Sequence, residues 1–305
     1  MMIYTNKEIN ISNYKKLFRH VFLATLSMLV LSSCSSEETK DTSTKANTET
    51  KLLFKSGFED GVYIDTASKN ELESYRFIRG KDKETGYSFP INILGTKDSA
   101  LHYIDHDGFQ ALKSEIVTVV GHKGTNTKAL YSAEYYGTKE TELSYKVLNI
   151  KEGMKDLYIK YWIKLDAQSL TQPNGWRTFF QWVSKDYDKG TGFRLISFIY
   201  TDSDGNPYWH WQGDIDSKNP IWEIDNKVIP VPKNEWFLTE FYWHWSEGSD
   251  GRALWKVNGQ VVGDYRGATT RNAKAIDFIM LNQIYGNVNP KHQWVDDIEI
   301  WNGLK

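Results

Sequence analysis

The stretch covering residues 236–259, WFLTEFYWHWSEGSDGRALWKVNG, constrains the fold more than any other part of the chain. Its first half alternates, with one face dominated by aromatic rings and the opposite face carrying Tyr242 and His244. A cluster of turn residues follows, and a second β-rich run ends at Asn258-Gly259, a pair suited to turns with positive φ. The pattern predicts a long antiparallel hairpin with one face in a core and the other lining a groove.

The rest of the chain after residue 52 consists mostly of short β-rich runs between turn clusters, with scarcely any stretch of helical period. This pattern predicts an all-β fold, either a jelly roll or a concanavalin A-like sandwich of two antiparallel sheets. No repeat of fixed period and no Pro/Gly linker divides residues 52–305, so we expect one domain there. The runs expected as strands are 111–120, 129–136, 157–165, 177–183, 193–200, 207–211, 236–245, 253–257 and 275–285.

The N-terminal part has the features of an export signal. Basic residues precede an apolar run, 21–31, which is too short to span a membrane comfortably, and Leu31-Ser32-Ser33-Cys34 follows. That tetrapeptide resembles a bacterial lipobox, in which the cysteine is acylated. Cys34 is the single cysteine of the chain, which excludes an intramolecular disulfide. We expect a lipoprotein signal peptide at 1–33, lipidation such as palmitate on Cys34, and a disordered tether at 34–51.

The acidic pair Glu37-Glu38 resembles the surface-export signals of lipoproteins in the Bacteroidetes group. This resemblance implies a protein anchored in the outer membrane by its lipid and facing the cell exterior. We expect no other membrane contact.

The amino-acid composition limits the classes of ligand that the protein is expected to bind. A net charge of −2 supplies no overall field to attract nucleic acid or another polyanion, so binding of an acidic ligand would need a local arrangement of Lys and Arg. The 12 tryptophans and 18 tyrosines suit a surface that stacks on sugars. A sandwich core would account for about half of these rings, since strands prefer aromatics. We expect a monomer that binds a polysaccharide and no nucleic acid.

Polar residues alternate with rings on two more predicted strands. On residues 176–184, WRTFFQWVS, Arg177 and Gln181 fall on one face. On residues 207–213, PYWHWQG, one face carries Tyr208, His210 and Gln212. Strands that present His, Tyr, Gln and Arg together would form a groove for a chain-like polar substrate. No phosphate-binding loop, H-E-x-x-H zinc motif or G-x-S-x-G elbow occurs, and we expect no organic cofactor.

In the order of these features the chain resembles the jelly-roll polysaccharide lyases, the group that includes heparin lyase I-like, alginate lyase and ulvan lyase families. The shared features are a GFEDG entry strand, Gln181 after Trp176, the hairpin at 236–259, a late strand with Tyr285, and a terminal DDIEIW. Relatives often carry Arg-x-Glu-x-Arg and Gln-x-His strands, where this chain has Ser132-Ala133-Glu134 and Gln181-Trp182-Val183.

The resemblance implies cleavage of a uronic-acid polysaccharide, for example ulvan or alginate, by β-elimination. It implies Tyr285 as acid/base and His210 or His244 as its partner, because His and Tyr suit proton transfer. Arg177 and Gln181 would bind the uronate carboxylate, where donors stabilise the charge that develops. The remaining residues expected to contact the sugar are Gln212, Tyr242 and Tyr208.

The resemblance also implies a structural calcium ion. A carboxylate that shares a strand face with Ile298 and Ile300, as Asp296 does, is costly to bury unless it is paired or binds a cation. Oxygen ligands suit Ca²⁺, and the candidate ligands are Glu59, Asp296 and Asp297. Solvated carboxylates at a sheet edge are the alternative.

Two other functions fit the same fold. A non-catalytic surface glycan-binding protein would present exposed Trp and Tyr without a His/Tyr pair. A glycoside hydrolase would need two carboxylates about 5 to 10 Å apart, for which Glu134 and Glu240 are candidates. A lone strand His is also more often structural than catalytic, and we expect the rings of Trp209, Trp211, Trp243 and Trp245 to pack in the core.

Overall fold

The chain divides into two units, Met1–Asn47 and Thr48–Lys305, of which only the second is described by the computed structural model. Within it the description covers residues 49–305, apart from 66–67, 71–72, 92–99, 104, 107–108, 111, 136–153, 185, 217–218 and 273–275. The expected signal peptide, Cys34, Glu37-Glu38 and most of the tether therefore lie outside the described residues. No helix in the described part of the chain is long and apolar enough to cross a membrane.

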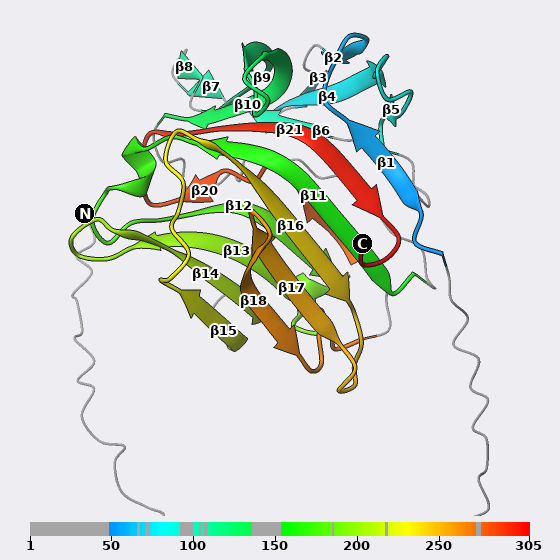
Figure 1. Ribbon diagram of the computed structural model, residues 1–305, viewed down its shortest axis with the longest axis vertical. Helices are drawn as coiled ribbons and strands as arrows, with labels where there is room; N and C mark the ends of the chain where they lie inside the picture. The colour runs from blue at the N-terminus through cyan, green and yellow to red at the C-terminus, as the bar shows by residue number, and fades with distance from the viewer. Residues whose placement is uncertain are drawn as a thin grey trace, which may run out of the picture. The chain divides into compact units, whose positions relative to one another are not determined.

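Two antiparallel sheets form a sandwich, which confirms the predicted fold class (Figure 1). The larger, here called the β21 sheet, has among the described residues eight strands: in order β18 (Gln260–Arg266), β17 (Arg252–Val257), β16 (Trp236–His244), β11 (Asp156–Leu165), β21 (Lys291–Trp301), β10 (Asn126–Glu134) and β9 (Leu112–Val120), with β1 (Leu52–Ser56) also paired to β21. The other, here called the β13 sheet, has six: in order β15 (Pro220–Asn226), β14 (Pro207–Asp214), β13 (Arg194–Thr201), β12 (Trp176–Ser184) and β19 (Ile276–Met280), with β20 (Tyr285–Gly286) also paired to β12.

Smaller elements complete the described part. β4 (Glu73–Lys81) pairs with β2 (Val62–Ile64), β3 (Ser68–Asn70), β5 (Ser88–Phe89) and β6 (Ala100–Tyr103), while β7 (Asp105–His106) pairs with β8 (Phe109–Gln110). Two 3-10 turns, Gln168–Leu170 and Tyr187–Lys189, flank β12.

Aromatic rings from both sheets meet in the core. Phe180 of β12 stacks on Phe241 of β16 with ring centroids 3.9 Å apart, and Trp182 stacks on Trp243 at 5.3 Å. Trp209 packs edge-on against Phe237. All of these rings are buried, as are Trp211 and Trp245, so the predicted core role of the strand tryptophans is confirmed. Burial of rings this size is the main favourable term that holds the two sheets together.

A β-bulge in β12 changes which side chains face the core. The register of β12 against β13 shifts between Thr178 and Phe180, so Phe179 and Phe180 both point inward. A bulge adds one residue to one strand and shifts the alternation that follows it. Arg177 therefore lies in the interior while Gln181 lies on the outer face, and the prediction that they share a face is wrong.

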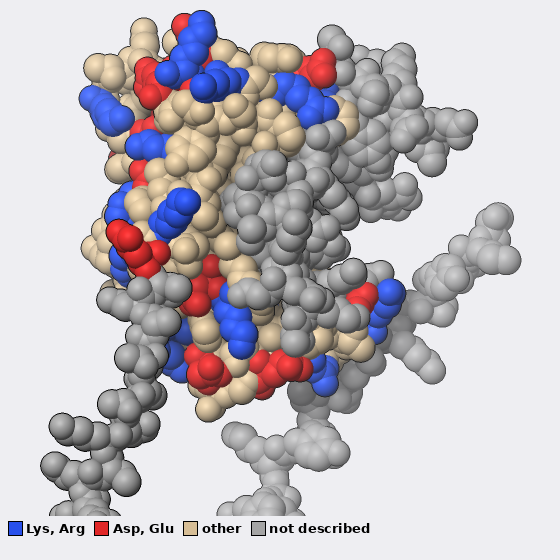
Figure 2. All heavy atoms as spheres, turned by 90° about the vertical axis from the view of Figure 1, so that its right-hand side faces the viewer, with Lys and Arg blue, Asp and Glu red and all other residues tan. Residues whose placement is uncertain are grey.

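Most predicted strand runs match observed strands. The run 275–285 is instead two short strands, β19 and β20, that both pair with β12. Strands β15 and β18 of the two sheets were not predicted, and neither were strands β2 to β8. Basic and acidic side chains are interspersed over the described surface in the view of Figure 2.

Candidate functional site

The outer face of the β13 sheet gathers polar and aromatic side chains from several strands. One register row runs Tyr285, Thr178, Phe198, His210 and Asp225 across β20, β12, β13, β14 and β15. The neighbouring row contains Gln181, Ile196, Gln212 and Glu223. Because side chains in one row point to the same side of a sheet, these strands bring an imidazole, phenols and amides to one face.

His210 supplies the imidazole of this face. Its Nδ1 lies 2.7 Å from Oδ1 of Asp225, so the ring donates its Nδ1 proton to that carboxylate. The other nitrogen, Nε2, is buried and has no hydrogen-bond partner in the described part of the chain, with a carboxylate oxygen of Glu223 3.6 Å away. The tautomer is assigned from this contact pattern, which leaves the Nε2 lone pair available to accept a proton.

The face opens at the β15 edge. His210 is only 8% exposed, whereas the side chains of Glu223 and Asp225 are each 51% exposed. A substrate that reaches Nε2 would approach past these two carboxylates.

Two tyrosines flank the histidine. The Tyr200 ring lies edge-on to the His210 ring with centroids 4.8 Å apart, and Tyr208 stacks beside Tyr200 at 6.0 Å. Burial raises the pKa of both phenols above the ordinary value. Both hydroxyls therefore keep their protons at neutral pH and can act as proton donors. Lys227, whose ammonium lies 4.6 Å from the Tyr208 ring centre, adds a cation.

The side-chain amides of Gln181 and Gln212 lie in the adjacent row, and each already forms a hydrogen bond within the protein. Gln181 accepts a hydrogen bond from Gln283 Nε2 at 3.2 Å, so its own NH₂ is the donor group that a ligand can use. Gln212 donates to Asp214, which Arg194 also binds through Nε and Nη2. An amide NH₂ carries two hydrogens, so Gln212 keeps one further donor.

The structure contradicts the expected position of Arg177. Its side chain is buried between the sheets, where it donates to Asp166 Oδ1 at 3.0 Å, Ser169 Oγ at 2.7 Å and Gln293 Oε1 at 2.7 Å. It shares the inward face of Phe179, and the bulge that follows it in β12 places Gln181 on the opposite face. Arg177 anchors one sheet to the other and does not reach the outer face.

His244 and Tyr242 also lie away from His210, which contradicts the expectation of one shared groove. They project from β16 in the β21 sheet, where they pair with Asp156 and Tyr158 of β11. His244 Nδ1 contacts Asp156 Oδ1 at 2.9 Å, and the Tyr242 hydroxyl donates to the same oxygen. The alternation in residues 236–245 is as predicted, but the strand belongs to the other sheet.

The candidate hydrolase pair of Glu134 and Glu240 is likewise wrong. Glu134 is buried and forms an ion pair with the buried Lys291, with Oε2 and Nζ 2.8 Å apart. Glu240 lies on the outer side of the β21 sheet and accepts a hydrogen bond from Tyr158. The two carboxylates therefore do not face a common substrate.

Tyr285 is on the expected face but at its far end. It is 39% exposed and packs edge-on against Trp176 at 5.1 Å. In the register row Tyr285 lies three strands away from His210. At a strand spacing of about 4.8 Å, their backbones are about 14 Å apart. The structure thus places Tyr285 on the same face as His210 but beside Trp176, three strands away from the imidazole.

Sequence reasoning missed Asp225, Glu223 and Tyr200. The signal was present in the β15 sequence, where Trp222 and Ile224 alternate with the two acids. That alternation predicts a strand with both carboxylates on one face.

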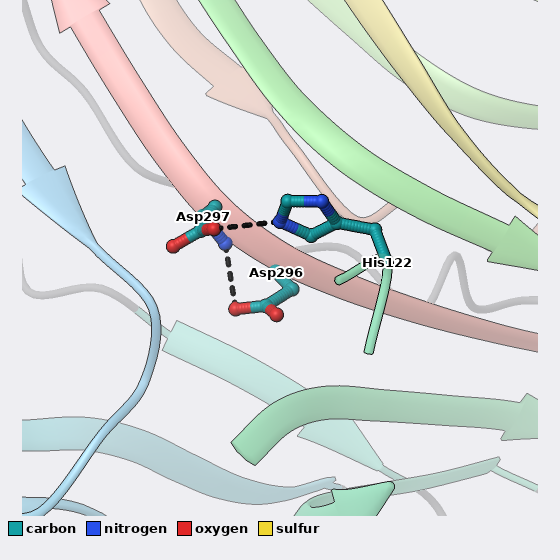
Figure 3. A group of neighbouring side chains, drawn as sticks. All are labelled: His122, Asp296 and Asp297. Carbon is teal, nitrogen blue, oxygen red and sulfur yellow. Dashed lines mark hydrogen bonds and ion pairs between the residues drawn. The ribbon is translucent and has the colours of Figure 1, made fainter. Parts of the chain in front are cut away.

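The three predicted metal ligands line one cavity beside β21, and the ligand atoms of His122, Asp296 and Asp297 lie within 4.8 Å of one another. Asp296 is buried and its Oδ1 accepts from the Asp297 N–H at 2.7 Å, while Thr127 Oγ1 bridges Glu59 Oε1 at 2.6 Å and Asp296 Oδ2 at 3.3 Å. Figure 3 shows the His122 ring directed at Asp297, with Nε2 and Oδ2 2.8 Å apart. These residues line a cavity of about 160 Å³.

The electrostatics of this cluster suit a hard cation. Burial, together with the charges of Asp297 and Glu59, raises the pKa of Asp296 to about 7. Burial opposes ionisation of Asp297 too, but the hydrogen bond from His122 and the charge of Lys123 hold its pKa below the ordinary value. A cation bound by oxygen atoms would relieve the repulsion between Asp296 and Glu59, so the donor set fits Ca²⁺.

The two sheets and their connections define a jelly-roll sandwich. No protein-family model and no curated protein sequence matches the chain. Among solved structures it is similar to the alginate lyase Aly36B, with a TM-score of 0.49 and 15% identity, covering 61% of this chain and 82% of that one.

Two other solved structures are similar to this chain over a comparable length. An endo-β-1,4-glucuronan lyase from the fungus Trichoderma reesei has a TM-score of 0.43 and 12% identity, covering 62% of this chain and 87% of that one. The cellulose-induced protein Cip1 has a TM-score of 0.43 and 15% identity, covering 67% of this chain and 93% of that one. At these identities the likeness concerns the fold alone.

Proposed function

We propose that this protein is a polysaccharide lyase that cleaves a uronic-acid-containing polysaccharide by β-elimination. The observation that carries this proposal is His210, whose Nδ1–H is fixed by Asp225 while its Nε2 has no hydrogen-bond partner among the described residues. A base held in one tautomer beside protonated phenols is the arrangement that proton abstraction next to a carboxyl group requires.

The proposed reaction uses the outer face as follows. His210 Nε2 removes the C5 proton of the uronate, and the electron pair moves into the carboxylate to give an enolate-like intermediate. The NH₂ groups of Gln181 and Gln212 stabilise the added charge on that carboxylate. The pair then forms the C4–C5 double bond as the C4–O bond breaks.

The leaving oxygen needs a proton, which we assign to Tyr200. Its hydroxyl stays protonated because burial raises its pKa, and its ring is already in contact with His210. Tyr208 is the alternative donor on the same side of the histidine. Tyr285 and Trp176, at the far end of the row, suit contacts to sugar rings away from the cleaved bond.

The test incubates the protein with uronate polysaccharides and follows the ultraviolet absorbance of the unsaturated product. We expect absorbance to rise with at least one of them, and the His210→Asn variant to lose that rise. Retention of a glycan without any cleavage by the unaltered protein would instead favour a glycan-binding function.

A glycoside hydrolase is the second candidate, and one observation favours it. Glu223 and Asp225 are half-exposed carboxylates two residues apart on the same face of β15, and both contact His210. Two carboxylates across a glycosidic bond are the usual hydrolase pair. Release of reducing sugar without a new ultraviolet absorbance would identify this activity and exclude β-elimination.

We also propose that Glu59, Asp296 and Asp297 bind a structural calcium ion. Their convergence in one cavity supports the proposal. The site lies on the β21 sheet, whereas His210 lies on the β13 sheet, so the ion would stabilise the fold rather than take part in the reaction. Calorimetry with and without Ca²⁺ tests it.

For the N-terminal part we propose acylation of Cys34 and display on the outer membrane. The lipobox-like tetrapeptide supports this proposal. Metabolic labelling with a fatty-acid analogue should mark the protein but not the Cys34→Ser variant. Equal labelling of both would exclude lipidation at this residue.

A further inference from the structure

A second row of side chains crosses the outer face of the β21 sheet. Tyr131 of β10 pairs with Trp294 of β21, Trp294 pairs with Lys164 of β11, and Lys164 pairs with Trp236 of β16. All four side chains are partly exposed. The row thus presents three aromatic rings and one cation on four adjacent strands, and none of them belongs to the His210 site or the calcium cluster.

Lys164 differs from the other cations of this sheet. Its ammonium lies 4.5 Å from the Trp294 ring centre and 5.5 Å from that of Trp236, and among the described residues it has no carboxylate partner. By contrast, Lys160 on the same strand lies 2.9 Å from Glu299. A cation that contacts only ring faces keeps its capacity to bind an anion.

The rings form a continuous strip. Tyr131 and Trp294 are 5.2 Å apart, and the Trp236 ring is fixed by a hydrogen bond of 2.9 Å from its Nε1 to the Val120 carbonyl. Three strand steps of about 4.8 Å give a length of about 14 Å from Tyr131 to Trp236. A strip of this length can face several consecutive sugar rings.

We propose that this row, Tyr131–Trp294–Lys164–Trp236, is a second binding surface for an acidic polysaccharide chain. Lys164 binds a carboxylate of the glycan, and the three rings stack on the sugar units beside it. The choice of ligand rests on the proposed function, because the row would hold the same class of polymer that His210 acts on, but on the opposite sheet.

The charge of Lys164 determines which kind of polysaccharide the row would bind. Burial lowers the pKa of Lys164, which means that its charged form lacks stabilisation, and an anionic sugar would supply it. A neutral glycan would use the rings and leave the ammonium without a partner. The row therefore favours a uronate polymer over a neutral one.

The test measures retention of the full chain in native gels that contain a uronate polysaccharide, with a neutral polysaccharide as comparison. The Lys164→Gln variant removes only the charge and should weaken binding to the acidic polymer about tenfold, with a smaller dependence on salt. The double variant Trp236→Ala with Trp294→Ala should weaken it further. Lys305→Gln is the matched control, since Lys305 also lies over an indole, that of Trp301 at 3.9 Å, but outside the row.

The His210→Asn variant separates this proposal from the lyase. The comparison is made within the His210→Asn background, which is expected not to cleave the polymer. If the row binds the polymer, adding Lys164→Gln weakens retention of that protein. This result would stand even if no elimination were detected. Unchanged retention of the Lys164→Gln and double-tryptophan variants, with unchanged thermal stability, would overturn the second surface while leaving the lyase intact.

Discussion

The two sheets each present a histidine whose Nδ1 contacts an aspartate. His210 contacts Asp225 at 2.7 Å on the β13 sheet, and His244 contacts Asp156 at 2.9 Å on the β21 sheet. In sequence the two look alike, since each follows an aromatic residue on an alternating strand. Their surroundings are different, and the difference separates a candidate base from a structural histidine.

Around His244 every neighbour is already paired. Tyr242 donates to Asp156, and Asp250 lies 3.7 Å from His244 Nε2, in a position where it is 74% exposed. Around His210 the second nitrogen is buried without a hydrogen bond in the described part of the chain. Each ring therefore lies between two carboxylates, since Glu223 is also 3.6 Å from His210 Nε2. What distinguishes His210 is that this nitrogen is buried beside the Tyr200 ring, whereas the phenol beside His244, Tyr242, already donates to Asp156.

The largest effect is expected when each histidine is replaced by asparagine. We expect His210→Asn to lower kcat/KM for the uronate polymer by about 10³-fold, the scale of a lost general base. His244→Asn should change it less than about twofold. Ultraviolet absorbance of the product measures both. Equal losses of kcat/KM in the two variants would mean that the two histidines do not differ in their role in catalysis.

The second test compares two buried phenols. Tyr200→Phe removes the proposed acid and should lower kcat by about 10²-fold, while Tyr242→Phe, on the other face, should leave it unchanged. Since burial raises the pKa of Tyr200, the phenol stays protonated through neutral pH, and activity should fall only as pH rises past that raised pKa. Loss of this alkaline fall in Tyr200→Phe, seen in a pH profile, would identify Tyr200 as the donor.

Sequence alone could predict the face of His210 but not its partner. Side chains alternate with a period of two, so the rings of Trp209 and Trp211 in the core fix His210 on the outer side. Which carboxylate lies opposite depends on the register of β14 against β15, a pairing between separate segments. The alternation in β15 shows two acids on one face, yet nothing local shows that they meet His210.

The wrong positions expected for Arg177 and His244 have different physical causes. Arg177 and Gln181 were wrongly expected on one face because a bulge at Phe179 and Phe180 interrupts the alternation between them, and a bulge has no reliable local signature. His244 was misplaced because alternation shows that a strand has two faces but not which sheet it joins. That the calcium candidates lie close together was easier to predict, since Glu59 follows β1 and Asp296 lies on β21, and the first and last strands of a sandwich often pair.

A smaller effect is expected from the carboxylates that orient the two histidines. Asp225→Asn leaves the imidazole in place but removes the acceptor that fixes its tautomer, so we expect kcat to fall about tenfold. Asp156→Asn is the matched change at His244 and should not alter turnover. If Asp225→Asn instead abolished reducing-sugar release in a protein that forms no ultraviolet product, Asp225 would be a hydrolase carboxylate and the elimination chemistry would be excluded.

The smallest effect on turnover should come from removal of calcium, because Asp296 and Asp297 lie on the β21 sheet, away from His210. Chelation should lower stability by about 2–3 kcal/mol if the ion is present at about a hundred times its dissociation constant. Turnover well below the melting temperature should change less than about twofold. Asp296→Asn should reduce the stabilisation by added Ca²⁺, and Asp225→Asn should not, as calorimetry would show. A chelator that abolished turnover without changing the melting temperature would place the cation in the reaction and undo the separation between the two faces.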